Sequence, residues 1–277
     1  MLTPGFDRVR RKLRGLRGER RCARQRDPLT GRDRPIVTTF YDVEGDYARR
    51  GATPAEIESI GRILEIERRC GIRSTYNIVG RFALDAPSLV ARIRDAGHEI
   101  ASHSYDHSNL TRLGKAKLLE NLERTRRAFE ELGITVLGHR SPQSAWDERV
   151  LGALADTGFA WNAENGREPY PYRIRLQDGK MLWRFPVAAD DWQYESEGLA
   201  PARMLERFKQ LVRGARGRRT HLAIGFHAWV ESAPGRLAAL EELFHWLVDE
   251  ERVEIMPFGD VLRTASSAAP EPAAAHG

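Results

Sequence analysis

The sequence predicts an α/β protein of one domain, in which about seven mostly parallel strands form a distorted (β/α) barrel. Three observations lead to this prediction. From residue 35 onward, short apolar runs alternate with longer amphipathic segments, as in parallel sheets covered by helices. The 277 residues contain neither an internal repeat nor a linker that would divide them. Ionisable residues follow several of the apolar runs, where the loops of such a barrel begin.

The apolar runs give the predicted strands, and the amphipathic segments give the helices. The strands are residues 35–41, 74–79, 98–102, 134–138, 159–164, 221–226 and 253–258. Helical spacing of apolar residues predicts helices over 53–71, 87–96, 114–132, 146–157, 202–213 and 234–251. Residues 166–190 interrupt this alternation. There, Asp178-Gly179 separates YRIRL from MLWRFPV and predicts the turn of a β-hairpin.

The first long helix carries its own boundary signals. Thr53 and Glu56 have the spacing of a capping box, and Pro54 stands at the first helical position. Gly71 is the residue type that most readily takes the left-handed conformation that ends a helix. We therefore expect this helix to begin after Thr53 and to end at Gly71.

The net charge of +5 is concentrated near the N-terminus. Residues 1–35 hold twelve Lys or Arg and four Asp or Glu, a local charge of +8 that leaves −3 for the other residues. The body therefore lacks the positive excess of a nucleic-acid groove, and we expect no nucleic-acid partner.

The leader, residues 1–34, and the tail, residues 265–277, flank the predicted domain of residues 35–264. The leader fits either a basic amphipathic helix on an anionic membrane surface or a solvated, disordered extension. The tail has nothing to bury and is predicted to be disordered. Without the apolar run of a signal peptide, and with Cys22 and Cys70 as the only cysteines, we expect a cytoplasmic location, extending to peripheral contact with the inner membrane surface.

Ionisable residues follow four of the predicted strands. Asp42 and Glu44 follow residues 35–41, and His103 and His107 follow residues 98–102. Arg140 follows residues 134–138, while His227 follows residues 221–226. In parallel α/β folds the carboxyl ends of the strands share one edge. We therefore expect these side chains to meet at one rim.

Two imidazoles and one carboxylate form a ligand set for Zn²⁺ or another divalent first-row ion. Both rings could face one ion if residues 103–107 turn helically, with Ser102 and Asp106 available to orient them. Alone, HxxxH is also the pattern of coincidental surface histidines, and DVEGD that of a polar turn with solvated acids. The convergence on one rim favours the metal site over both alternatives.

These residues resemble the polysaccharide deacetylase family, carbohydrate esterase family 4, over roughly residues 36–260. The family motifs correspond to TFYDVEG (39–45), HSYDH (103–107), HRSPQ (139–143), DDW (190–192) and AIGFHAW (223–229). The resemblance implies a distorted barrel, one divalent ion and hydrolysis of an N-acetyl group. It implies metal binding by His103 and His107, orientation of the catalytic base by Arg140, and proton donation by His227, held by Asp191.

The first motif departs from the family and leaves two registers open. If Phe40 takes the place of the family's phenylalanine, Tyr41 falls at the base position and Asp42 at the metal position, which leaves no base. If Tyr41 takes that place, Asp42 is the base and Glu44 the metal ligand, as in relatives with a DxD-like motif. We prefer the second register because it fills both roles.

The resemblance also bears on substrate contacts. Gln143 replaces the tyrosine that usually ends the RxPY motif. In the family this tyrosine acts through its backbone N–H, so the backbone N–H of Gln143 is expected to take the same place beside the oxyanion. Trp192 and Trp229, at motif positions, are the aromatic residues expected to contact a sugar. The predicted cofactor is one divalent ion, with zinc preferred and cobalt, nickel or iron as alternatives.

Four functions remain in competition at this point, the last of them nucleic-acid binding through the basic leader, residues 1–34. The first is metal-dependent removal of an N-acetyl group from a sugar of a polysaccharide or glycan intermediate. The second keeps the chemistry but acts on a small cyclic amide or imide. The third is a non-catalytic carbohydrate-binding relative. No pattern in the sequence specifies the sugar, the length of the polymer or the oligomeric state.

Overall fold

The structure is a computed structural model and describes residues 27–32, 34–45 and 53–268. Most of the predicted leader therefore lies outside the described residues, as does the tail beyond residue 268. None of the helices in the described part of the chain combines the length and apolar character of a membrane-spanning segment. The membrane contact of the leader stays a prediction.

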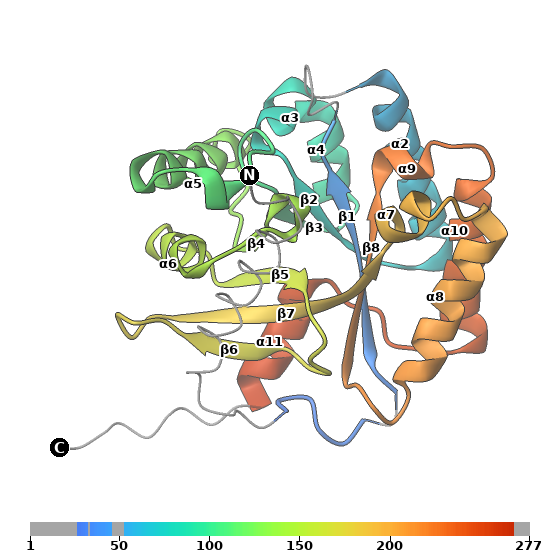
Figure 1. Ribbon diagram of the computed structural model, residues 1–277. Coiled ribbons are helices and arrows are strands. Elements are labelled where there is room, and N and C mark those ends of the chain that lie inside the picture. The colour runs from blue at the N-terminus through green and yellow to red at the C-terminus, as the bar shows by residue number, and fades with distance from the viewer. Residues whose placement is uncertain (1–26, 33, 46–52, 269–277) are drawn as a thin grey trace, which may run out of the picture.

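Seven parallel strands close into a barrel, which confirms the predicted fold class (Figure 1). Their order around the barrel is β1, β2, β3, β4, β5, β7 and β8, and β8 pairs again with β1. The strands are β1 (Ile36–Val43), β2 (Thr75–Ile78), β3 (Glu99–Ser102), β4 (Gly138–Arg140), β5 (Trp161–Asn165), β7 (Met181–Asp190) and β8 (His221–His227). An eighth strand, β6 (Tyr172–Arg175), runs antiparallel to β7 outside the closed ring.

Helices surround the barrel in the alternating order that the sequence predicts. They include α2 (Pro54–Cys70), α3 (Gly80–Asp85), α4 (Pro87–Asp95), α5 (Lys115–Glu130), α6 (Glu148–Asp156), α7 (Asp191–Ser196), α8 (Pro201–Ala215), α9 (Ala228–Glu231), α10 (Arg236–His245) and α11 (Phe258–Ala268). Short helical turns are η1 (Leu110–Arg112), η2 (Pro142–Ser144) and η3 (Trp246–Glu250). The short α3, α7, α9 and the C-terminal α11 lie outside the predicted segments.

One predicted strand is wrong because of the way the barrel closes, and another is displaced along the chain. Residues 253–258 make only one bridge, Val37 with Ile255, on the part of the β1 edge that β2 leaves free. The seventh barrel strand is β7, which was predicted only as half of a hairpin. Its length lets it pair with β5, β6 and β8. Residues 134–137 precede β4, which begins at Gly138.

Large aromatic rings fill the end of the barrel opposite the carboxyl ends of the strands. The ring of Phe258, at the start of α11, lies 5.6 Å from Phe40, 4.9 Å from Trp161 and 5.0 Å from Phe185. A Cβ atom on Gly225 would lie 2.3 Å from Phe40, so only glycine leaves room for this ring. Ala265 of α11 is also buried. In barrels of parallel strands, functional sites lie at the opposite end, where the carboxyl ends of the strands meet.

The boundary signals of α2 hold, with one difference. The Thr53 side chain accepts a hydrogen bond from the Glu56 N–H at 3.3 Å, and Gly71 ends the helix with a φ of 66°. The other half of the capping box is wrong, because the Glu56 carboxylate accepts hydrogen bonds from the N–H groups of Glu44 and Gly45. The predicted hairpin is confirmed, with Gly179 at a φ of 85° in its turn.

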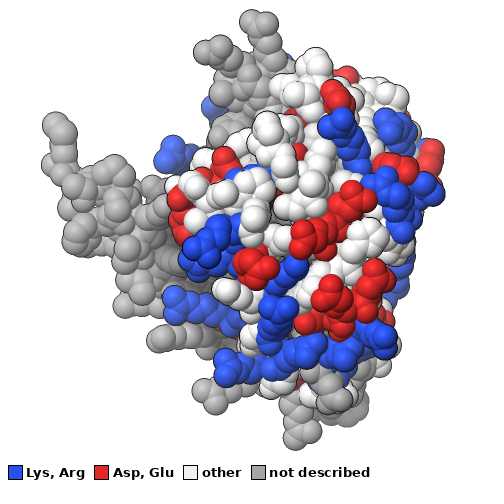
Figure 2. Space-filling view, turned by 90° about the vertical axis from the view of Figure 1, so that its right-hand side faces the viewer, with Lys and Arg blue, Asp and Glu red and all other residues white. Residues whose placement is uncertain are grey.

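Charges of both signs are interspersed on the face shown in Figure 2. Ion pairs at the surface of the outer helices join such charges, for example Arg69 with Glu241 at 2.6 Å and Arg127 with Glu123 at 3.4 Å. Such exposed pairs contribute little to stability, about 0–1 kcal/mol each.

Candidate active site and metal centre

The predicted convergence of side chains is present at the carboxyl ends of the strands. Asp42, on β1, has Asn77 of β2 and His227 of β8 as its lateral neighbours in the sheet. His103 and His107 lie in the loop after β3, and Arg140 ends β4. These side chains are buried or nearly so.

Glu44, His103 and His107 form a compact group of donor atoms. Glu44 Oε1 lies 3.4 Å from His103 Nε2 and 3.1 Å from His107 Nε2. The backbone that brings the rings together is not the helical turn expected from the spacing of four residues. Ser104 and His107 have φ values of 65° and 60°, so the segment is an irregular turn. The two ring centroids are 5.1 Å apart.

The loop after β3 is held by side chains that the sequence assigned another role. Asp106 accepts hydrogen bonds from Ser108 N–H and Asn121 Nδ2. Ser102 Oγ contacts His139 Nδ1 at 3.0 Å. These contacts fix the loop, whereas the His103 ring is oriented by the carbonyl oxygen of Arg140, 2.9 Å from Nδ1. The expectation that Ser102 orients this ring is therefore wrong.

The tautomer of His103 shows that the group fits a cation. A carbonyl oxygen can only accept, so His103 Nδ1 carries the hydrogen, and in the neutral ring Nε2 directs its lone pair toward Glu44. A lone pair facing a carboxylate oxygen is repulsive unless a proton or a metal ion lies between them. Burial alone would lower the pKa of His103, but the charges of Asp42 and Glu44 raise it above its usual value. A divalent ion would compete for this same position.

Asp42 has a separate set of partners. Arg140 Nε donates to Oδ2 at 2.7 Å, and Asn77 Nδ2 donates to Oδ1 at 2.8 Å. Burial raises the pKa of Asp42, but the charge of Arg140, followed by those of His103 and His227, lowers it below its ordinary value. Asp42 is therefore ionised at neutral pH.

Arg140 is buried and surrounded by acceptors. Besides Asp42, it contacts Asp190 Oδ2 through an Nη at 3.2 Å and the Ala163 carbonyl oxygen at 3.4 Å. Burial works against its charge, but Asp42, Asp190 and Glu164 outweigh burial and raise its pKa. Asp190 also caps α7 by accepting the N–H of Gln193 at 3.2 Å. The same carboxylate thus starts the helix and holds the guanidinium.

His227 is bound to Asp191 at two points. Nδ1 lies 2.6 Å from Asp191 Oδ1, and the backbone N–H donates to Oδ2 at 2.7 Å. Burial alone would lower the pKa of His227, but Asp191, then Glu44 and Asp42, raise it to about 10. With Nδ1 engaged by Asp191, Nε2 faces the site, 3.8 Å from Asp42 Oδ2 and 3.7 Å from Glu44 Oε1.

Two tryptophans and Gln143 lie around this group. The Trp192 side chain is half exposed and meets Trp229 edge to face at 5.5 Å, and Trp229 lies 6.0 Å from the His227 ring. Gln143 has a φ of 60°, and its side-chain oxygen accepts from Asn109 Nδ2 at 3.0 Å. The backbone oxyanion contact of Gln143 and the sugar contacts of both tryptophans stay predictions.

Several acids near the site were missed by sequence reasoning. Glu164, on β5, accepts from Ser141 N–H at 3.0 Å and from Ser144 Oγ at 2.7 Å. It thereby holds the turn in which Gln143 and Ser144 both have positive φ. Only the place of Glu164 near the carboxyl end of a predicted strand could have signalled it. Burial raises the pKa of Glu56 to about 7.

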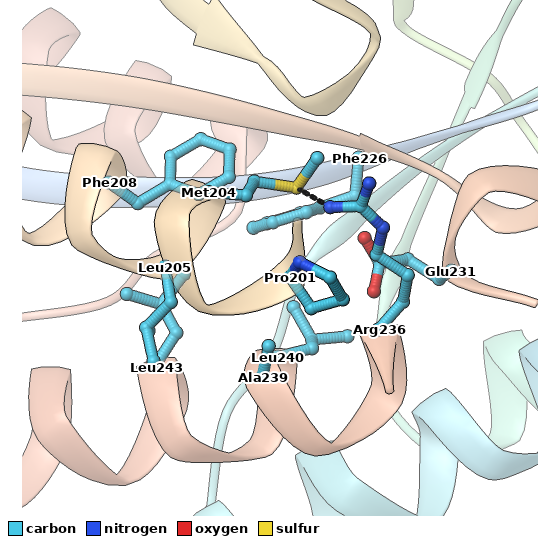
Figure 3. A pocket seen from close by; sticks show the side chains of 10 residues that line it. All are labelled: Pro201, Met204, Leu205, Phe208, Phe226, Glu231, Arg236, Ala239, Leu240 and Leu243. Carbon is cyan, nitrogen blue, oxygen red and sulfur yellow. Dashed lines mark hydrogen bonds between the residues drawn. The ribbon is translucent and has the colours of Figure 1, made fainter. Parts of the chain in front are cut away.

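Behind α9, a cavity of about 10 Å³ has room for about one water molecule. Figure 3 shows its largely apolar lining with Glu231 and Arg236. Arg236 contacts Met204 Sδ at 3.0 Å. Burial and the nearby charge of Asp191 hold the pKa of Glu231 well above its usual range. The cavity is lined by residues of α8, β8, α9 and α10 and offers no space for a substrate.

Comparison with known proteins adds an independent observation. Residues 31–161 match the family model described as polysaccharide deacetylase. The chain is 22% identical over 144 residues to peptidoglycan-N-acetylglucosamine deacetylase PgdA of Listeria monocytogenes, covering 52% of this chain and 26% of that protein. It is 28% identical over 137 residues to a chitooligosaccharide deacetylase of Sinorhizobium fredii, covering 48% of this chain and 58% of that one. The chain thus spans between about a quarter and three fifths of these relatives.

The fold also resembles a solved structure, that of PuuE allantoinase. The TM-score is 0.77 at 20% identity, and the match covers 90% of this chain and 96% of the other. At this identity the likeness concerns the fold alone.

Proposed function

Since the chain belongs to the polysaccharide deacetylase family, we propose that it removes an N-acetyl group from a sugar of a polysaccharide or glycan intermediate. One observation carries this proposal: two acids that lie two residues apart have different surroundings. Asp42 is bound by Arg140, whereas Glu44 faces His103 and His107. One acid is thus suited to proton transfer and the other to a cation. This division also favours the register with Asp42 as base.

Glu44, His103 and His107 would hold one divalent ion. When bound, such an ion polarises an amide carbonyl and lowers the pKa of a water molecule. Zinc suits two imidazoles and one carboxylate, and cobalt, nickel and iron accept the same ligands. The alternative register would need Tyr41 as the base, but Tyr41 is fully buried and stacks on Tyr76 at 4.8 Å.

Asp42 is ready to accept a proton from the attacking water. Its carboxylate is ionised at neutral pH, and Arg140 and Asn77 hold one oxygen each. Arg140 therefore fixes the direction in which Asp42 presents its oxygens. Because general-base catalysis needs hydrogen-bond reach, this fixed direction matters more than the pKa alone.

His227 is suited to protonate the amine that leaves. Asp191 holds Nδ1 and keeps the ring charged, so that Nε2 carries a proton toward the site. His227 Nε2 lies 3.8 Å from Asp42 Oδ2, so the proposed acid and the proposed base lie side by side in one site. Trp192 and Trp229 stand beside His227, where a sugar ring could stack.

The direct test is acetate release by the full chain, loaded with zinc, from N-acetylglucosamine oligomers. The proposal expects turnover that disappears in Asp42→Asn while bound zinc is retained. Binding of oligomers with zinc present but without acetate release would favour a non-catalytic protein. Ring opening of a cyclic amide such as hydantoin, without deacetylation, would keep the chemistry but overturn the proposed substrate.

A further inference from the structure

We propose that Glu56 is a positioning residue for the cation site, which fixes the end of β1 and thereby aims Glu44 at His103 and His107. The inference rests on the proposed function, because it concerns the same site. Glu56 lies in the first turn of α2, and its side chain is 1% exposed.

The contacts of Glu56 are with the backbone on either side of the Glu44 Cα. Oε1 accepts from the N–H of Glu44 at 3.3 Å and from the N–H of Gly45 at 3.2 Å. One carboxylate oxygen therefore binds two successive backbone amides. Oε2 is buried and makes no hydrogen bond within the described residues.

Gly45 makes this arrangement possible. Its φ is 70°, so the chain turns out of the extended conformation directly after Glu44. Successive N–H groups at such a turn point the same way and form an anion-binding concavity. Glu56 supplies the acceptor oxygen from within the chain. Without it, two buried amides would lose their acceptor, and the turn would lose the contact that fixes it.

The position of this turn decides where the Glu44 side chain can reach. Glu44 Oε1 lies 3.4 Å and 3.1 Å from the two imidazole nitrogens, so a small rotation of the backbone would separate the group. His103 and His107 are fixed by their own loop, far from α2 in the sequence. Glu56 is thus the link between the helix and the ligand on β1. Partners of metal ligands typically contribute about 10–100-fold to metal affinity.

The experiment is zinc affinity, measured by competition with a chromogenic chelator, together with the absorption spectrum of the cobalt form. Glu56→Leu removes both the acceptor and the charge, and should weaken zinc binding by about 100-fold. Glu56→Gln keeps an acceptor oxygen of the same shape and should weaken it by about tenfold. The cobalt spectrum should change in Glu56→Leu because the position of Glu44 changes.

The matched control is Glu67, a second buried acid of α2, which contacts the hydroxyl groups of Ser74, Tyr76 and Tyr41 rather than the backbone at Glu44 and Gly45. Glu67→Leu should lower stability but leave zinc affinity within about twofold. Wild-type affinity in a folded Glu56→Leu would overturn the inference and leave the proposed function intact. Absence of zinc binding in the wild-type protein would overturn both.

Discussion

Arg140 Nε lies 2.7 Å from Asp42 Oδ2, although 98 residues separate them in the sequence. Each side chain is 3% exposed, so the contact is an ion pair inside the protein. The carbonyl oxygen of Arg140 also orients the ring of His103. One residue at the end of β4 therefore arranges both the proposed base and a proposed metal ligand.

Asp42→Asn should reduce kcat by about 10²–10⁴-fold, the usual contribution of a general base. Zinc content should stay at the wild-type level, because Glu44 and the two histidines are unchanged. Acetate release and metal analysis on the same sample check this. A variant that keeps its zinc and near-normal turnover would show that Asp42 is not the base.

Arg140→Met should lower the free energy of unfolding by about 3–5 kcal/mol, because Asp42 would be left buried without its partner. Urea unfolding of the metal-free protein measures the change. The control is Arg69→Met, whose ion pair with Glu241 is 42% and 35% exposed, and which should cost at most about 1 kcal/mol. Equal losses in the two variants would contradict the assignment of Arg140 as a buried partner.

Removal of metal by a chelator should lower the melting temperature, and zinc should restore it. An ion that binds only the folded state at 100 times its Kd stabilises by about 2.7 kcal/mol. His103→Ala removes a ligand and should melt at the same temperature with and without zinc. If zinc still stabilised His103→Ala as much as the wild type, the ion would bind elsewhere.

Stability should fall as the pH rises between about 6.5 and 8, and Glu67 contributes to this fall together with His227, whose pKa is raised to about 10. Burial raises the pKa of Glu67 to about 8, against hydrogen bonds from the hydroxyl groups of Ser74, Tyr76 and Tyr41 that lower it. The folded state therefore keeps a proton that an unfolded glutamate, with a pKa of 4.5, has already lost. Because the unfolded state binds fewer protons, unfolding becomes easier as the pH rises toward 8.

Three buried histidines oppose this trend only at lower pH. Burial lowers the pKa of His98 to about 4, and those of His139 and His221 to about 3, so their effect ends near 6.5. Glu67→Gln should therefore reduce the loss of stability between pH 6.5 and 8 by about 2 kcal/mol. Urea midpoints at these two pH values test this, and an unchanged difference would mean that Glu67 is ionised in the folded protein.

Glu164→Gln should be destabilising by about 1–3 kcal/mol although the two side chains have the same shape. Ser141 N–H and Ser144 Oγ each donate to a different oxygen of Glu164, so the amide nitrogen of glutamine would face a donor. Ser144→Ala, which removes one of these donors, should cost only about 1 kcal/mol. Urea unfolding compares them, and a neutral Glu164→Gln would remove Glu164 from the support of this turn.

The alternation of apolar and amphipathic segments was enough to predict the barrel. Capping residues predicted the limits of α2, and turn residues predicted the hairpin. These features depend on local patterns: period, capping residues and turn residues. The choice of β7 over residues 253–258 as the seventh strand was not predictable in this way. It depends on which strand edges are free once the other strands have paired, and that is a property of the whole sheet.

By itself, the sequence determined which residues stand at the strand ends and hence that Asp42, Glu44, His103 and His107 share one rim. Only the tertiary structure decided their partners: the carbonyl that sets the His103 tautomer, the guanidinium beside Asp42, and the Glu56 carboxylate on the β1 turn. The physical reason is range. Periodicity and capping act over a few residues, whereas these hydrogen bonds form between segments that meet only when the barrel closes.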